Sequence, residues 1–328
     1  MADRGARVEP GRGAMADFSN RRGRGDRTVG DMRVHHINCG TMCPASARLV
    51  LGEGGLFARA RMVCHCLLIE SDDGLVLVDT GLGERDVADP SRLGRRFLVR
   101  SAPRLDPAET AVAHVERLGF SRSDVRHIVP THLDLDHVGG LADFPAATVH
   151  VFGDELAAAR APTGPSKTFG YRPVQWSHGP RWAPYAVAGE RWFGFDAVRV
   201  IPGLGTDVLL VPLVGHSAGH CGVAVRTGDR WLLHAGDAYF HHREIDPLAP
   251  RTPLGLRWFQ RRRSTDDAAR VANQARLRRL VAEHAGEVSV FSAHCATELD
   301  RHAGDPVSSV AAASPTRRES ARARAGGG

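Results

Sequence analysis

Short apolar runs separated by polar turns define most of the strands that the chain predicts. Runs at residues 63–70 and 75–79 flank Asp72-Asp73-Gly74, a turn signal that predicts a β-hairpin. Six more apolar runs have the length of buried strands, at residues 125–130, 148–152, 207–214, 221–226, 231–235 and 287–292. Helical spacing occurs at residues 108–118, 154–160 and 264–284. This succession of strands and helices predicts an α/β (α+β) fold, a layered sandwich of sheets and helices.

One segment, residues 169–195, has an unusual concentration of aromatic side chains interrupted by prolines. Its aromatic residues are Phe169, Tyr171, Trp176, Trp182, Tyr185, Trp192, Phe193 and Phe195. The prolines at 173, 180 and 184 exclude a continuous helix. Two interpretations stay open: a lid or wall over an apolar substrate, or an irregular loop anchored to the core by its own aromatics.

The two ends of the chain differ in composition from its middle. Residues 1–30 are rich in glycine and arginine, and residues 303–328 in alanine, serine, arginine and glycine, so we expect disordered tails around one folded domain at 31–302. The formal net charge of +6 comes mostly from these tails. Because the middle is nearly neutral, it lacks the basic surface of a nucleic-acid-binding protein, and no nucleic-acid partner is expected.

The composition also bears on the cellular compartment. No apolar run reaches the roughly 18 residues of a membrane-spanning helix, and the first 30 residues lack the apolar stretch of a secretion signal. The six cysteines are too sparse for a disulfide scaffold. These features favour a cytoplasmic protein that does not enter a membrane.

Four side chains able to bind a metal lie close together directly after the predicted strand 125–130. They are His132, Asp134, Asp136 and His137, followed by two glycines. Alternate residues of an extended segment share a face, so the first three side chains can converge on one point. Acidic groups packed this densely beside a buried strand cost free energy unless a cation neutralises them. The cluster therefore predicts a metal site.

Three later residues extend this candidate site. His216 follows the apolar run 207–214, Asp237 follows the run 231–235, and His294 ends the sequence Ser292-Ala293-His294 after the last run. Each lies beside glycine or alanine, which leave space for an ion. The ends of strands are also where layered folds usually place the residues of a site.

With these motifs the chain resembles the metallo-β-lactamase fold hydrolases. The hallmark of that family is H-x-H-x-D-H after a strand, then a lone His, an Asp and a final His, each at a later strand end. The corresponding residues are His132, Asp134, Asp136, His137, His216, Asp237 and His294, and Val78-Asp79-Thr80-Gly81 resembles the family's early D-T-G turn. The resemblance covers about residues 33–300 and implies an αββα sandwich with a binuclear metal centre.

The resemblance also implies how the ligands are divided. One ion would be held by His132, Asp134 and His216, and the other by Asp136, His137 and His294, with Asp237 bridging. Asp134 departs from the family, which has a histidine there. A carboxylate suits zinc, but it also shifts a site toward manganese or iron, and it can equally stand off the metal. We expect two divalent metal ions, zinc first, with manganese or iron as alternatives.

Such a centre predicts hydrolysis of a small-molecule substrate. Two cations lower the pKa of a bound water, and the metal-bound hydroxide attacks the carbonyl of an ester, lactone or thioester. Asp136 can move a proton between the water and the leaving group. Tyr239, two residues after Asp237, can donate to the oxyanion, or it can be a packed strand tyrosine. His220 is expected to orient a ligand. Among hydrolases of this fold, lactonases resemble this arrangement most, because they have a tyrosine near the bridging aspartate. In lactonases the spacing between that aspartate and the tyrosine is different, and the second residue of the motif is a histidine.

Other functions stay open at this stage. Asp134 suggests a di-iron or mono-iron oxidoreductase of the same fold, although no flavin-binding segment follows residue 302. The arginine-rich tails suggest a nuclease, which the neutral middle opposes. The lack of a secretion signal argues against a β-lactamase. The presence of metal-capable residues at all seven ligand positions argues against a binding protein that has lost catalysis.

Overall fold

Two six-stranded sheets packed face to face form the centre of the molecule. The computed structural model describes residues 32–163 and 170–302. The first sheet has the order β1 (Arg33–Met42), β2 (Met62–Ser71), β3 (Gly74–Val78), β4 (Val125–Val129), β5 (Thr148–Phe152) and β6 (Arg181–Tyr185). The second has the order β12 (Val288–Phe291), β11 (Arg230–His234), β10 (Cys221–Thr227), β9 (Val208–Pro212), β8 (Phe195–Val200) and β7 (Glu190–Trp192).

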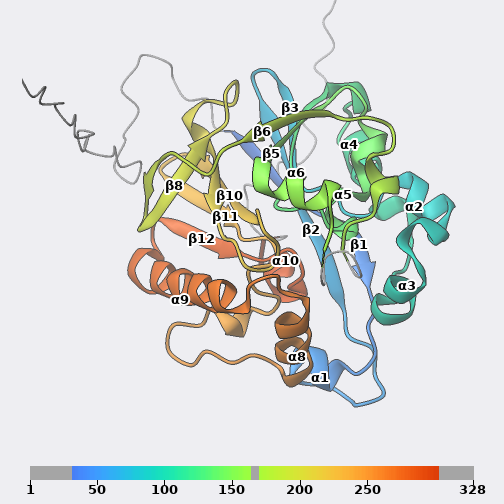
Figure 1. The fold of residues 1–328 in the computed structure, drawn as a ribbon, viewed down its shortest axis with the longest axis vertical. Helices are drawn as coiled ribbons and strands as arrows, with labels where there is room; N and C mark the ends of the chain where they lie inside the picture. Colours follow the sequence, from blue (N-terminus) through green and yellow to red (C-terminus); the bar gives the residue numbers. More distant parts are fainter. Residues whose placement is uncertain (1–31, 164–169, 303–328) are drawn as a thin grey trace, which may run out of the picture.

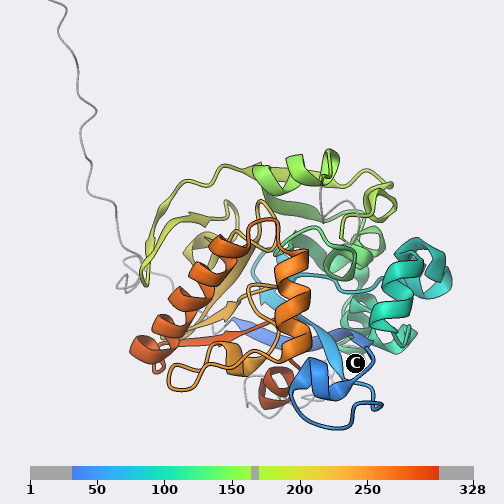
Figure 2. The ribbon, with the colours of Figure 1, turned by 60° about the horizontal axis from the view of Figure 1, so that its bottom comes forward.

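Helices lie on the outer sides of this pair of sheets (Figure 1). Those beside the first sheet are α2 (Glu84–Ala88), α3 (Arg95–Ser101), α4 (Ala111–Arg117), α5 (Leu135–Val138) and α6 (Gly153–Arg160). Those on the other side and at one end are α1 (Ala47–Leu51), α8 (Leu254–Arg263), α9 (Asp267–His284) and α10 (Ala296–His302). Figure 2 shows α8 lying next to α1. The predicted αββα sandwich is confirmed.

The continuous apolar runs follow from burial of both faces of each sheet. Along β2, Leu67 and Ile69 point into the core between the sheets, where they pack in one cluster with Phe291 of β12. Their neighbours Cys66 and Leu68 belong to a separate cluster between the first sheet and its helices. A strand covered on both faces needs apolar residues at every position, which explains why these segments lack alternation.

The structure confirms the hairpin and shows which strands the sequence analysis missed. Strands β2 and β3 pair antiparallel, with Ser71 opposite Gly74 at the turn. The sequence analysis expected His35 and His36 to lie on an early strand but gave no bounds for β1, because these histidines and Asn38 interrupt its apolar pattern. The predicted tails, residues 1–30 and 303–328, lie outside the described residues. Among the described helices, none has both the length and the apolar character needed to cross a bilayer.

The aromatic segment forms strands at the edges of both sheets. Trp182 lies on β6 and packs against the first sheet's outer cluster, while Trp192 of β7 and Phe195 of β8 are buried in the cluster under the second sheet. Phe169 lies outside the described residues. The described aromatics therefore anchor edge strands to the two cores.

The D-T-G turn after β3 offers a test of backbone constraint. Gly81 has φ +59°, and a Cβ there would overlap the carbonyl oxygen of Cys39. Gly119 also has a positive φ, +88°, but nothing lies within 4 Å of the Cβ position. We expect Gly119→Ala to lower the free energy of unfolding by about 1 kcal/mol, from the left-handed backbone alone. Gly81→Ala should cost about 3 kcal/mol or more, because β1 must also move. Urea unfolding measures both, and equal losses would contradict the steric argument.

Candidate metal centre

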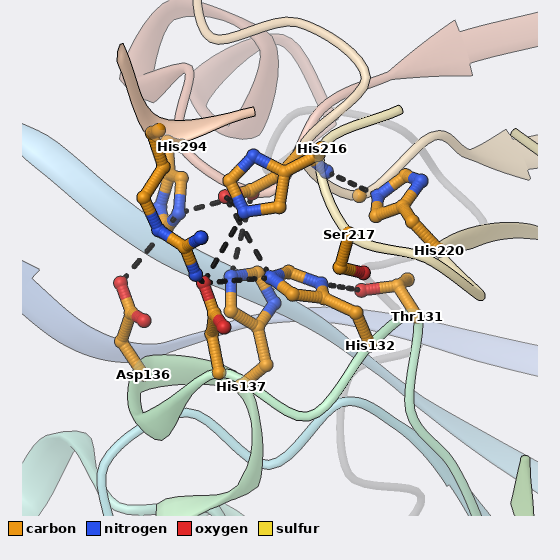
Figure 3. Close-up of polar contacts among 12 residues, drawn as sticks. Thr131, His132, Asp136, His137, His216, Ser217, His220 and His294 are labelled. Atoms are coloured by element: carbon orange, nitrogen blue, oxygen red, sulfur yellow. Dashed lines mark hydrogen bonds and ion pairs between the residues drawn. The ribbon is translucent and has the colours of Figure 1, made fainter. Parts of the chain in front are cut away.

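All seven predicted ligands lie together where strands of both sheets end. Residues 132–137 follow β4, His216 follows β9, Asp237 follows β11 and His294 follows β12. Figure 3 shows His132, His137, His216 and His294 converging, with Asp136 beside His294. Each strand delivers its ligand at its carboxyl end, so the topology alone brings together residues up to 162 positions apart.

Asp237 lies between two groups of these side chains. Its Oδ2 is 3.4 Å from Nε2 of His216 and 3.8 Å from Nε2 of His132. Its Oδ1 is 3.1 Å from Nε2 of His294 and 3.4 Å from Nε2 of His137. One carboxylate therefore presents one oxygen to each pair of imidazoles, which is the arrangement expected of a ligand shared by two ions.

Candidate ligand atoms also gather into compact sets. The sets whose atoms lie within 4.8 Å of one another are His132, Asp134 and His216; Asp136, His137 and His294; and His132, His137 and Asp237. All of these residues are buried except Asp136, which is partly exposed. The first two sets have the membership that the family resemblance implies for the two ions.

Several of these buried atoms have no hydrogen-bond partner among the described residues. They are Nε2 of His132, Nε2 of His137, Nδ1 of His216, Oδ1 of Asp134 and Oδ1 of Asp237. Buried polar atoms are normally satisfied, since leaving one without a partner costs about 1–3 kcal/mol. Imidazole nitrogens and carboxylate oxygens that share one small volume are the donors that zinc, manganese or iron accept. The residues present therefore fit a metal centre.

Contacts behind three of the four imidazoles fix which ring nitrogen faces the centre. Nδ1 of His137 lies 2.8 Å from Oδ2 of Asp79, and Nδ1 of His294 lies 2.8 Å from the carbonyl oxygen of Val63. Nδ1 of His132 lies 3.0 Å from Oγ1 of Thr131. With each Nδ1 occupied, Nε2 is the atom that remains for a metal.

Asp79 has a larger role than its place in the D-T-G turn indicated. Besides His137, its carboxylate accepts from the backbone N–H of Thr131 at 2.7 Å and from the Thr131 hydroxyl at 3.0 Å. Burial alone would raise the pKa of Asp79, but the charge and hydrogen bond of His137 outweigh it and lower that pKa. Asp79 is therefore a buried carboxylate that orients one imidazole.

His220 and Glu155 hold the loops that present the ligands. Nε2 of His220 accepts from the backbone N–H of Asp237 at 2.9 Å, so His220 orients a candidate ligand, as predicted. Glu155 accepts from the backbone N–H of Leu133 at 2.9 Å, from the hydroxyl of Ser217 at 2.7 Å and from the N–H of Gly219 at 3.0 Å. The sequence analysis did not predict this role of Glu155. An acidic residue in the first turn of a helix is common, so its position in α6 did not distinguish it.

The electrostatics of Asp237 agree with its central place. Burial alone would raise its pKa, but the imidazoles of His294, His137 and His216 outweigh burial and hold that pKa well below the usual range of a carboxyl group. Asp237 is thus held as a carboxylate, the form that binds a cation.

Comparison with known proteins decides the family. The family model for the metallo-beta-lactamase superfamily matches residues 59–274. The chain belongs to the metallo-β-lactamase superfamily. A probable metallo-hydrolase of Mycobacterium tuberculosis is 42% identical over 269 residues, covering 80% of each chain.

Solved structures of this superfamily share the fold at low sequence identity. A variant of AiiA from Bacillus thuringiensis, with N-decanoyl-L-homoserine bound at its active site, superposes with a TM-score of 0.63 at 20% identity, covering 83% of this chain and 97% of that one. The dizinc quorum-quenching lactonase AidC, in complex with a product, gives 0.56 at 15% identity, covering 82% and 90%. The sequence prediction of a metallo-hydrolase of this superfamily is confirmed at that level.

The predicted role of Tyr239 is wrong. Its side chain is fully buried under the second sheet, and its hydroxyl donates to Oε1 of Glu298 at 2.9 Å. The next residue, Phe240, lies at the centre instead and stacks on His294 with ring centroids 5.1 Å apart. The packed-tyrosine alternative is the one that the structure supports. Asp136 does lie beside His294, with Oδ2 3.7 Å from Nε2.

A cavity of about 540 Å³ opens over the candidate ligands. Its apolar lining comes from β1, β2, α3 and α8 and from the loops beside them, and includes Met42, Met62, Leu93, Phe97, Phe240, Leu256 and Phe259. Arginines also contribute, among them Arg95, Arg172 and Arg263. None of the described aromatics of 169–195 lines it, so the interpretation of that segment as a wall over the substrate is not supported.

Removal of the Asp79 carboxylate should weaken metal binding. Asp79→Asn leaves the size of the side chain unchanged but removes the charge that orients His137, and we expect about a 10–100-fold loss in zinc affinity, measured by competition with a chelator. Asp143→Asn is the matched control, because Asp143 is also buried but bonds only to the backbone N–H of Glu84. An equal loss in both variants would contradict an orienting role for Asp79.

Tyr239→Phe should affect stability and leave the reaction unchanged. Burial raises the pKa of Glu298 to about 7, and the Tyr239 hydroxyl stabilises its ionised form. Loss of that donor should therefore cost about 1–2 kcal/mol of unfolding free energy at pH 8, where Glu298 is ionised, and less at pH 5, where it is protonated. Denaturant unfolding at the two pH values measures this. A fall in kcat with unchanged stability would restore the oxyanion role.

Proposed function

We propose that this chain is a hydrolase that uses two divalent metal ions to open a small ester, lactone or thioester. The observation behind this proposal is Asp237, whose two oxygens face two separate pairs of imidazoles at 3.1–3.8 Å. A carboxylate placed in this way can bind two neighbouring ions, one through each oxygen. Zinc is the first candidate, with manganese or iron as alternatives.

The residues divide between the two ions as their positions suggest. His132, Asp134 and His216 would hold one ion, and Asp136, His137 and His294 the other, with Asp237 between them. When bound, the ions would lower the pKa of a coordinated water and polarise the carbonyl of the substrate. Asp79 and His220 keep His137 and Asp237 in place, so that little reorganisation is needed during the reaction.

Asp136 is the candidate for proton transfer. All three aspartates of the ligand set line the cavity, but only Asp136 is partly exposed, whereas Asp134 and Asp237 are buried. The carboxylate of Asp136 can accept a proton from the attacking water and return it to the leaving oxygen or sulfur. No oxyanion donor is assigned to Tyr239, because its hydroxyl is bonded to Glu298.

The cavity favours a substrate with an apolar acyl part. Its lining beyond the metal centre is dominated by methionine, leucine and phenylalanine side chains. The AiiA structure with which this chain superposes holds N-decanoyl-L-homoserine, a molecule with such an acyl chain. None of the relatives reported above is named as an oxidoreductase or a nuclease, so those two hypotheses gain no support.

A substrate panel tests the proposal. The zinc-loaded and manganese-loaded protein should open N-acyl homoserine lactones or hydrolyse aryl esters or acyl thioesters, with kcat/KM rising roughly threefold for each added CH₂ while the acyl chain fits the cavity. Asp237→Asn should lower kcat/KM by about 100-fold or more. Asp196→Asn, which changes an exposed carboxylate outside the cavity, is the control. If no acyl substrate is turned over with any metal, the proposal is wrong.

A further inference from the structure

A buried arginine contacts the one ligand that departs from the family motif. Arg263, the last residue of α8, is 3% exposed, and its Nη2 forms a close ion pair with Oδ2 of Asp134. The same oxygen lies 3.2 Å from Nε2 of His216 and 3.4 Å from Nε2 of His132. A single carboxylate oxygen is thus shared by a guanidinium and two candidate metal ligands.

The surrounding backbone holds this ion pair in place. After Arg263, the N–H of Thr265 donates to the carbonyl of His216 at 3.1 Å, which ties the end of α8 to the loop of that ligand. On the other side Gly170 packs so closely that a Cβ there would overlap both Asp134 and Arg263. The guanidinium is therefore a fixed part of the centre, in contrast to a mobile surface charge.

The pair still has unused polar atoms. Nη1 of Arg263 and Oδ1 of Asp134 are buried and have no hydrogen-bond partner among the described residues. Oδ2 faces His132 and His216, so an ion in that subsite would meet the oxygen that Arg263 already holds, whereas Oδ1 lies against Gly170. A buried ion pair normally uses its remaining donors and acceptors, so these two atoms show that the pair is not fully satisfied by its protein contacts.

The charge of Arg263 balances the additional negative charge that Asp134 brings to the centre. The centre contains three carboxylates, on Asp134, Asp136 and Asp237, where the family motif has two. The positive charge of Arg263 cancels that of the additional carboxylate, so Asp134 and Arg263 together are neutral, like the histidine of the motif. The guanidinium also withdraws electron density from Asp134 and repels a cation placed beside it.

We propose that Arg263 is an internal cation that shares Asp134 with a metal ion and makes the two metal subsites unequal. The subsite of Asp136, His137 and His294 fills first. The subsite of His132, Asp134 and His216 binds its ion more weakly, because Arg263 competes for the carboxylate. This inference rests on the proposed two-metal centre, and it assigns Arg263 as a positioning residue that sets metal occupancy.

Metal titration of the purified full chain tests the inference without measuring activity. Zinc binding, followed by calorimetry and by competition with chelators, should resolve two affinities about 100-fold apart in the wild type. Arg263→Met, which keeps the length of the side chain and removes its charge, should tighten the weak subsite about 10-fold or more and change the strong one by less than about threefold. Arg263→Lys should lie near the wild type, because it keeps the charge.

Three further variants assign the affinities and control for burial. His294→Ala should remove the strong subsite, and His216→Ala the weak one. Arg270→Met is the matched control, since Arg270 is a buried arginine that bonds to Asp267 and Gln260 and to none of the seven candidate ligands. It should leave both affinities unchanged.

Stability provides a second measurement if Arg263→Met is poorly folded. That variant leaves Asp134 without a counterion, so zinc should raise its melting temperature more than that of the wild type. Two equal affinities in the wild type, or affinities and zinc-induced shifts unchanged in Arg263→Met, would overturn the inference and leave the two-metal hydrolase intact. A wild type that binds no divalent ion would overturn both.

Discussion

The structure around the centre depends on one constraint, the packing of three carboxylates and four imidazoles, all but Asp136 buried, into a small volume between the ends of two sheets. Asp237 has the most demanding place, since each of its oxygens faces two imidazole nitrogens. Burying charges of this kind is costly unless cations and fixed hydrogen bonds compensate for it. Many of the contacts described above supply that compensation.

Three residues outside the ligand set show how the sandwich provides these fixed bonds. Asp79 comes from the turn after β3 and reaches both His137 and the backbone of the β4 loop. Glu155 comes from α6 and connects that loop to the segment around Ser217. His220 holds the backbone of Asp237. Because these bonds cross between elements, a ligand cannot shift without disturbing the packing of a neighbouring strand or helix.

The structure brings together the seven candidate ligands that the sequence singled out, whereas most of the residues around them were not predicted, and both outcomes have physical reasons. Four of the candidate ligands lie within residues 132–137, and the other three follow apolar runs beside small residues, so both signals can be recognised in the sequence alone. Tyr239 was misassigned because sequence distance from Asp237 does not reveal which way a side chain turns after a strand. Strand β1 was not delimited, because its polar residues interrupt the apolar pattern. Arg263 lies 129 residues from Asp134, in a helix whose basic end resembles a solvated face.

Arg263 also shows why a motif substitution cannot be interpreted from the motif alone. Taken by itself, Asp134 adds a negative charge and a harder ligand, which would favour manganese or iron over zinc. The guanidinium fixed on Oδ2 cancels that charge, so the electrostatic reason for a change of metal is largely removed. What remains is a difference in how the ligand is shared: Oδ2 of Asp134, the oxygen nearest to His132 and His216, also binds the guanidinium of Arg263. The effect of Asp134 on metal binding therefore has to be considered together with Arg263, because the guanidinium offsets the charge of the carboxylate and shares its oxygen.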